Sequence, residues 1–127
     1  MRTPKLVKAL DAVTATTTSA AIDVREAKKI TLLFTRANHA AGSTAFTVTG
    51  CIEDDATTGT FVALNTLIDN VTNTNAQTLT RVASCTLSSD TSKVYSLDVD
   101  NFGYTFLKVT ATETTDGTHT AKVLVEY

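Results

Sequence analysis

Two histidines, two cysteines and two short acidic clusters are the side chains whose types could support catalysis or metal binding. His39 has no acidic or thiol residue close to it in sequence, and His119 follows Asp116 across an Asp-Gly turn. A hydrolytic triad needs a nucleophile, a base and an orienting group, and no nucleophile-elbow motif accompanies either histidine. We therefore interpret both histidines as ordinary loop or strand-end residues, and we predict a protein without enzymatic activity or catalytic residues.

The remaining ligand-type residues form no motif for a metal or a cofactor. The run Glu53-Asp54-Asp55 and the pair Asp98 and Asp100 could each bind calcium weakly, but their spacing matches no EF-hand loop. We interpret both clusters as solvated acidic turns. Zinc sites use closely paired cysteines and histidines, and phosphate-binding loops use clustered glycines. Neither pattern is present in the sequence, so no metal-ligating residue and no cofactor are predicted.

The two cysteines are assigned to sheet faces by strand alternation. In a strand over 45–53, Phe46, Val48 and Ile52 point inward and Cys51 points outward. In a strand over 78–87, Cys85 points inward. A disulfide requires close Cα atoms and converging Cβ vectors, so opposite faces predict two free thiols, which fits a reducing compartment.

Composition and charge exclude several classes of partner. The formal net charge of −2 gives no general attraction to nucleic acid or to an anionic membrane. Threonine makes up about a fifth of the residues, far above ordinary usage, and suits solvated strands. No apolar run has the length of a membrane span. Residues 1–5 are basic but are not followed by a continuous apolar stretch, so we do not expect a secretory signal peptide. We expect the chain to be made and folded in a cytoplasm.

Strand patterns are clearest near the end of the chain. Apolar and polar residues alternate with a period of two in 93–98, 105–113 and 118–127, as in half-buried strands. Asp116-Gly117 separates the last two strands, and Asp-Gly supplies the positive φ angles of a type I′ turn. We predict a β-hairpin there.

Further strands are predicted over 20–24, 29–36, 45–53, 61–64, 67–71 and 78–87. Leu33 leaves apolar surface on the second face of 29–36, so we predict that this strand lies in the centre of its sheet. The short strands 61–64 and 67–71 are predicted to lie at sheet edges. Eight to ten short strands without a substantial helix predict an all-β antiparallel β-sandwich, immunoglobulin-like or jelly-roll-like, over 19–127. The predicted core is Ile30, Leu32, Phe34, Phe46, Val48, Ile52, Leu97, Leu107, Val109, Val123 and Val125.

Residues 1–18 are the least regular segment, either an edge strand or an arm that docks on a neighbouring subunit or on another surface. The hypothesis of an arm assigns partner binding to its basic and apolar side chains: Arg2, Lys5, Leu6, Val7, Lys8 and Leu10. Residues 101–104, Asn-Phe-Gly-Tyr, are the most aromatic stretch and predict either a ridge for a sugar or partner, or a plug at one end of the sandwich.

Four segments carry a resemblance to a known family: 60–64, 96–100, 104–109 and 117–123. Together with the threonine content and the spacing of strands after about Ala20, they resemble small β-sandwich capsid decoration (cement) or auxiliary head proteins of tailed bacteriophages. The resemblance implies a virion protein on the capsid surface, often a trimer, that clamps adjacent subunits of the major capsid protein. That family has no invariant active residues, so no residue role is transferred from it.

A recognition or adhesion β-sandwich module, binding a glycan or a receptor on a phage fibre or a cell surface, is the alternative from another class. Glycan binders expose flat aromatic rings, and this chain has no Trp and only three Tyr. The shortage of aromatic residues favours the structural role.

Overall fold

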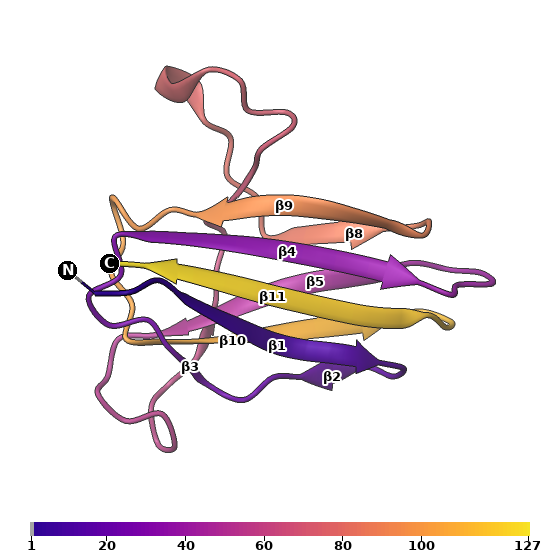
Figure 1. Ribbon diagram of the computed structural model, residues 1–127, viewed down its shortest axis with the longest axis horizontal. Coiled ribbons are helices and arrows are strands. Elements are labelled where there is room, and N and C mark those ends of the chain that lie inside the picture. The colour runs from indigo at the N-terminus through magenta and orange to yellow at the C-terminus, as the bar shows by residue number, and fades with distance from the viewer. Residues whose placement is uncertain (1) are drawn as a thin grey trace.

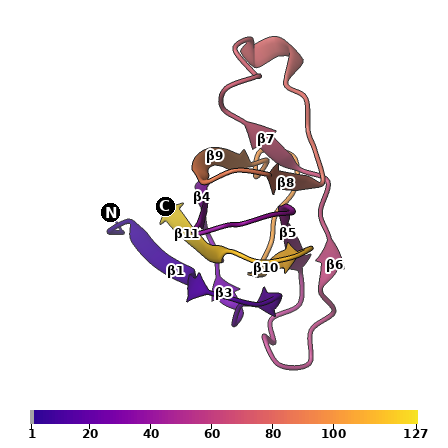
Figure 2. The same cartoon turned by 90° about the vertical axis from the view of Figure 1, so that its right-hand side faces the viewer.

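The computed structural model describes residues 2–127, which form two facing antiparallel sheets (Figures 1 and 2). Sheet A contains, in spatial order, β1 (Lys5–Val13), β11 (Thr118–Glu126), β4 (Lys29–Ala37), β9 (Thr91–Leu97) and β7 (Leu67–Asp69). Sheet B contains β2 (Thr17–Thr18), β10 (Phe106–Glu113), β5 (Thr44–Cys51) and β6 (Val62–Ala63), with β3 (Ile22–Asp23) on β10 and β8 (Ser84–Leu87) on β5. The predicted all-β sandwich is confirmed.

Strand pairing resembles one long hairpin folded across itself. The first strand pairs with the last, β1 with β11, and β2 and β3 pair with β10. Nested inside them, β4 pairs with β9, and β5 pairs with β8. This nested order is that of a jelly roll, which selects the jelly-roll-like alternative over the immunoglobulin-like one.

The core lies between the sheets because alternate residues of each long strand point inward. The phenyl rings of Phe34 and Phe46 stack across the two sheets with centroids 4.8 Å apart. Ten predicted core residues are buried: Ile30, Leu32, Phe34, Phe46, Val48, Leu97, Leu107, Val109, Val123 and Val125. The position of β4 in the middle of sheet A, and of β6 and β7 at sheet edges, also agrees with the sequence.

Ile52 is the exception in the predicted core, since 76% of its side chain is exposed. The strand ends at Cys51, so alternation no longer fixes the direction of the next side chain. Cys51 pairs with Phe106 on the outer side of sheet B, as expected, but the loop after it covers the thiol. A Cβ atom at Gly59 would lie only 2.5 Å from Cys51 Sγ, which shows how closely that loop packs. Both cysteines are free and buried.

The predicted hairpin at Asp116-Gly117 is wrong. β10 belongs to sheet B and β11 to sheet A, so the connection crosses from one sheet to the other. Of the two turn residues, Gly117 has a positive φ of 122°, whereas a type I′ turn requires positive φ at both. An Asp-Gly pair indicates a tight change of direction, but alternation fits a strand in either layer equally well.

Residues 5–13 form an edge strand, β1, in the chain's own sheet A. Their pairing with β11 continues along the strand, with irregularities between Lys8 and Leu10 and between Leu10 and Val13. Of the two alternatives for this segment, the structure shows the edge strand and not the arm that docks on another surface. The first and last long strands of the chain are thus neighbours in one sheet.

The chain between β5 and β8 makes two excursions from the sandwich. One follows β5, and the other, after β7, carries a short 3₁₀ turn at Ala76–Thr78 and projects beyond the sheets (Figures 1 and 2). The predicted strand over 78–87 is consequently shorter, Ser84–Leu87. Residues 2–127 include no helix long and apolar enough to span a bilayer.

Candidate functional site

The first strand contains all but one of the residues predicted to bind a partner, and two of the six donate hydrogen bonds to other parts of the chain. The guanidinium of Arg2 donates a hydrogen bond of 2.8 Å to Glu26 and lies 3.8 Å from the centroid of the Tyr127 ring. The ammonium of Lys5 donates a 2.7 Å hydrogen bond to the carbonyl of Asp23. Both cations therefore help to fasten the two termini to the turn after β3.

The other four residues divide between the core and the solvent. Leu10 is buried, and Val7 is half-buried against the same core. Leu6 has 66% of its surface exposed, and the ammonium of Lys8 lies 3.6 Å from the Asp11 carboxylate on the surface. Of the five residues that lie in β1, only Leu6 and Lys8 thus present most of their side chains outward.

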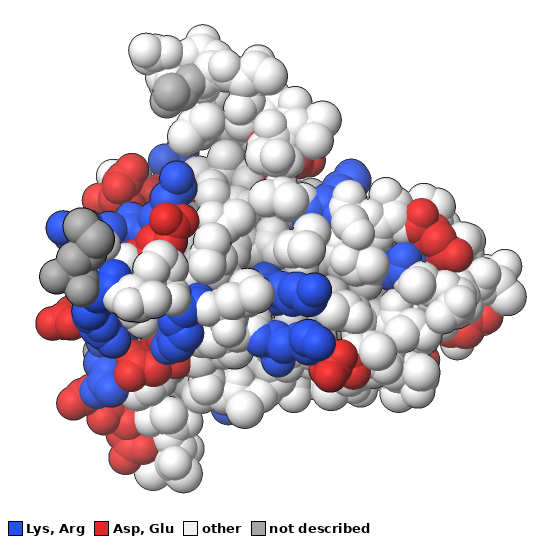
Figure 3. Space-filling view, viewed as in Figure 1, with Lys and Arg blue, Asp and Glu red and all other residues white. Residues whose placement is uncertain are grey.

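Leu6 and Lys8 belong to a larger surface, the solvent side of sheet A, which we call the front face. Strand register places two cross-strand rows side by side on it. The first row is Leu6, Leu124, Thr31 and Ser96, and the second is Lys8, Lys122, Leu33 and Val94. Figure 3 shows this face as mostly uncharged, with blue side chains near its middle and red ones gathered mainly towards its ends. The six residues of these rows that lie beyond β1 were missed because a sequence does not reveal which strands are neighbours.

His119 takes part in a buried polar chain rather than forming an ordinary strand end. Its Nε2 lies 2.8 Å from a Glu113 carboxylate oxygen, and its Nδ1 lies 3.2 Å from the hydroxyl of Thr44. A hydroxyl, an imidazole and a carboxylate in this order resemble a hydrolytic triad. Thr44 and His119 are fully buried, however, so a substrate has no access to the hydroxyl. The chain of hydrogen bonds ties β5, β10 and β11 together.

Arg36 lies in the same end of the sandwich, and its guanidinium is fully buried. It donates hydrogen bonds of 2.8 to 2.9 Å to the carbonyls of Ala41, Gly42 and Asp116, and a longer one of 3.4 Å to that of Leu87. One arginine thus joins the connections β4–β5 and β10–β11 to the last residue of β8, and these lie at one end in Figure 1. Arg36 was not singled out from the sequence.

His39 has an acidic partner that the fold provides. Its ring and its backbone N–H both contact the carboxylate of Asp90, in the β8–β9 connection. These two hydrogen bonds lower the pKa of Asp90 below its ordinary value, and the one from the His39 side chain has the larger effect. The pair is exposed and joins two loops, so it matches the interpretation of His39 as a loop residue.

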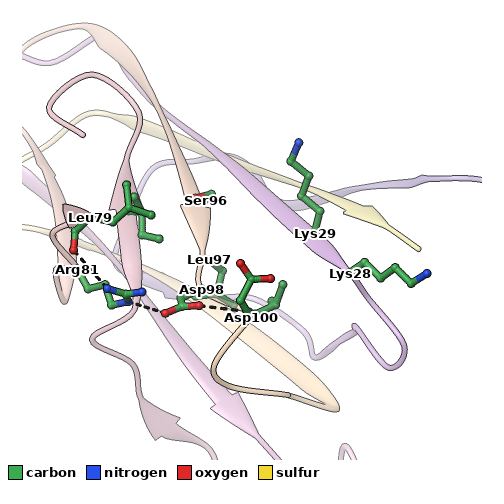
Figure 4. Close-up of a pocket in the computed structure, with 10 residues that line it drawn as sticks. Lys28, Lys29, Leu79, Arg81, Ser96, Leu97, Asp98 and Asp100 are labelled. Carbon is green, nitrogen blue, oxygen red and sulfur yellow. Dashed lines mark hydrogen bonds and ion pairs between the residues drawn. The ribbon is translucent and has the colours of Figure 1, made fainter. Parts of the chain in front are cut away.

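A hollow of about 190 Å³ opens beside the ends of β7 and β9 (Figure 4). Arg81 and Asp98 point towards one another within it, and Asn101 also donates to the Asp98 carboxylate. Burial alone would raise the pKa of Asp98, but hydrogen bonds from Asn101 and Arg81 outweigh it and hold the pKa low. The charged groups deepest in the hollow therefore satisfy each other.

The acidic run 53–55 also has structural partners. The Asp54 carboxylate lies 2.6 Å from the Arg25 guanidinium, and the Asp55 carboxylate accepts hydrogen bonds from the backbone of Thr57 and Thr58. Across residues 2–127, no three His, Cys, Asp or Glu side chains gather closely enough to hold a metal ion.

The aromatic stretch 101–104 combines the two predicted roles. Tyr104 packs against the core, and a Cβ atom at Gly50 would approach its ring to 2.8 Å. Phe102, by contrast, is half exposed. Tyr104 thus plugs the sandwich, and Phe102 alone remains for contact with another molecule.

The fold and these contacts define a jelly-roll β-sandwich whose buried ionic groups fasten its loops. No protein-family model and no curated protein sequence matches the chain. Among solved structures, the fold is similar to that of the SPBc2 prophage-derived protein YomS, with a TM-score of 0.65 and 13% sequence identity. The alignment covers 99% of this chain and 97% of that protein, so the two share a whole-chain architecture.

Proposed function

We propose that this protein is a non-enzymatic structural protein of a bacteriophage virion, a decoration (cement) protein on the outer shell of the head. The observation that carries the proposal is the similarity in fold, over almost the full length of both chains, to a prophage-derived protein. Jelly rolls recur in viral capsid proteins, and the strand pattern and threonine content resemble those of decoration proteins. The partner in this proposal is the major capsid protein.

The proposal includes a homotrimer at the capsid surface that stabilises contacts between neighbouring major capsid subunits. One small sandwich offers a limited area for binding, whereas linked copies raise the apparent affinity for a repetitive shell by orders of magnitude. Light scattering at micromolar concentration tests this directly. A mass three times that of the chain supports the trimer, and a monomer mass contradicts it.

Purified virions provide the main test. Tailed phage particles from a lysate of the strain that encodes the chain are banded by density, and heads are separated from tails. Mass spectrometry then measures the amount of this protein relative to the major capsid protein in each fraction. A fixed ratio in the head fraction supports decoration. Recovery only with tails or fibres, or only as free protein, contradicts it.

A recognition module remains a second candidate, because jelly rolls also occur in lectins and Phe102 presents a half-exposed ring. A glycan array with the purified chain, and with Phe102→Ala as its control, tests this role. Saturable binding that the substitution abolishes would favour recognition over decoration.

A further inference from the structure

Two lysines lie directly opposite each other in the middle of the front face. Lys8 on β1 and Lys122 on β11 are cross-strand partners, and like charges in this position destabilise a sheet. Asp11 lies 3.6 Å from Lys8, and one carboxylate neutralises only one of the two charges. The chain thus keeps an unfavourable pair of cations at a position where threonine, frequent elsewhere in the sequence, would fit a solvated strand.

Apolar side chains flank this pair on two sides. Leu6 and Leu124 are partners in the neighbouring row of the front face, and Leu33 continues the row of the lysines. Leu33, Leu124 and Lys122 are half-buried, and a lysine in such a position can cover apolar neighbours with its stem while its ammonium group stays in the solvent. Leu6 is largely exposed. The front face therefore combines two adjacent cations with an apolar platform.

We infer that the front face docks on a protein surface that presents carboxylates beside apolar side chains; given the proposed function, on which this inference rests, that surface belongs to a capsid subunit. A carboxylate placed between Lys8 and Lys122 would relieve their repulsion and form charge-assisted hydrogen bonds with both. A nucleic acid would use the cations but would leave Leu6, Leu33 and Leu124 without partners. The net charge of −2 also opposes polyanion binding.

The size of the front face fits a weak contact that is repeated. Four long strands about 4.8 Å apart, with seven to nine residues rising about 3.3 Å each, give an area of roughly 500 Å². This is below the roughly 800 Å² per partner of a typical stable interface. One copy should therefore bind weakly, and several copies on a repetitive shell should bind firmly together.

The test compares three variants for binding to purified phage heads in sedimentation assays. Lys8→Gln/Lys122→Gln removes both charges, and Lys8→Glu/Lys122→Glu reverses them while keeping a like-charged pair. Lys108→Gln is the matched control, because Lys108 lies mid-strand on the outer side of sheet B, 4.3 Å from the ring of Phe61. We expect binding about tenfold weaker or more for the glutamate variant, a smaller loss for the glutamine variant, and no change for the control.

Thermal melting separates docking from a merely structural role. The glutamine variant should melt at the same temperature as the native chain or slightly higher, since the repulsion is removed, although its binding weakens. Native binding by the glutamate variant overturns the inference and leaves the proposed function intact. No binding of the native chain to heads overturns both. Loss of self-association, or binding to DNA that depends on the two lysines, assigns the face to another occupant and also overturns the inference.

Discussion

Arg36 brings a permanent charge into the end of the sandwich, where its side chain is fully buried. Burying a guanidinium is expensive unless polar partners replace water, and the backbone carbonyls of Ala41, Gly42 and Asp116 do so here. The Asp116 carboxylate adds an opposite charge at 3.7 Å and also accepts hydrogen bonds from the backbone of Ala40 and Ala41. The backbone hydrogen bond from Ala40 is the main reason that the pKa of Asp116 is lowered.

Replacing Arg36 with Ala should destabilise the protein by about 3–5 kcal/mol, because the loop carbonyls lose their donor and a cavity forms. Urea unfolding followed by circular dichroism measures the change. The matched control is Arg2→Ala, which removes an exposed ion pair with Glu26 and should change stability by about 1 kcal/mol or less. Similar losses for the two variants would contradict a fastening role for Arg36.

The two buried thiols should differ in reactivity towards a thiol reagent. Cys51 is covered by a surface loop, which can open without unfolding the sheets, whereas Cys85 lies in the core cluster. Burial also raises the pKa of Cys85, so less thiolate is present. Pulse labelling and mass spectrometry should show Cys51 reacting first, and Cys85 only as fast as the whole domain unfolds. Faster labelling of Cys85 would contradict the assigned positions.

Buried apolar residues were predictable at the level of single residues, and buried polar ones were not. Val109 and Val123 follow from alternation alone, because sheet faces repeat every two residues. Arg36 and His119 occupy inward positions of the same alternation, but their polarity suggested exposure. Each has a partner that only the fold brings near, Asp116 for Arg36 and Thr44 for His119, and no local pattern encodes those contacts. The prediction that Ile52 is buried was wrong for a different reason. Strand β5 ends at Cys51, so alternation does not extend to Ile52.

The edge strand β1 provides a test within one element. Leu10→Ala should destabilise the protein by about 2–5 kcal/mol, because the side chain is buried in the core. Leu6→Ala, four residues earlier on the same strand, should change stability by about 0.5 kcal/mol or less, because its side chain is largely exposed. Thermal or urea unfolding of both variants gives the comparison.

Deleting residues 2–12 should lower the melting temperature sharply, since it removes most of β1 from its pairing with β11. This differs from the expectation from sequence that the sandwich spans residues 19–127 and that residues 1–18 can form an arm. Native stability of the deleted chain would show that β1 contributes little, and that an arm outside the domain describes these residues better.

Strand existence was predictable from sequence, whereas the assignment of strands to sheets was not. The patterns of β4, β10 and β11 gave nearly correct bounds because each long strand has one buried face. Turn residues between β10 and β11 indicated a hairpin, but the chain crosses between layers there. The pairing of β1 with β11 joins the two ends of the sequence, and only the complete jelly roll explains it.

The whole molecule combines a jelly roll with loops that are fastened by ionised carboxylates. Hydrogen bonding to Arg25 is the largest of the effects that lower the pKa of Asp23 to about 2 from 3.8. The same direction holds for four loop carboxylates: Asp55, Asp90, Asp98 and Asp116. Each group binds a proton less readily in the folded state than in the unfolded chain. Their shared contribution to stability is therefore complete above the unfolded pKa and is lost as the pH falls through the folded pKa.

Stability should consequently be nearly constant from about pH 7 to pH 5 and fall between about pH 4 and pH 2. Melting temperatures measured across this range by circular dichroism test the prediction. Asp98→Asn breaks the buried pair with Arg81, so the variant should be less stable at pH 7 but lose less on acidification than the native chain. An acid transition centred above pH 5, or a native melting temperature that stays constant down to pH 2, would show that these carboxylates do not hold the loops together.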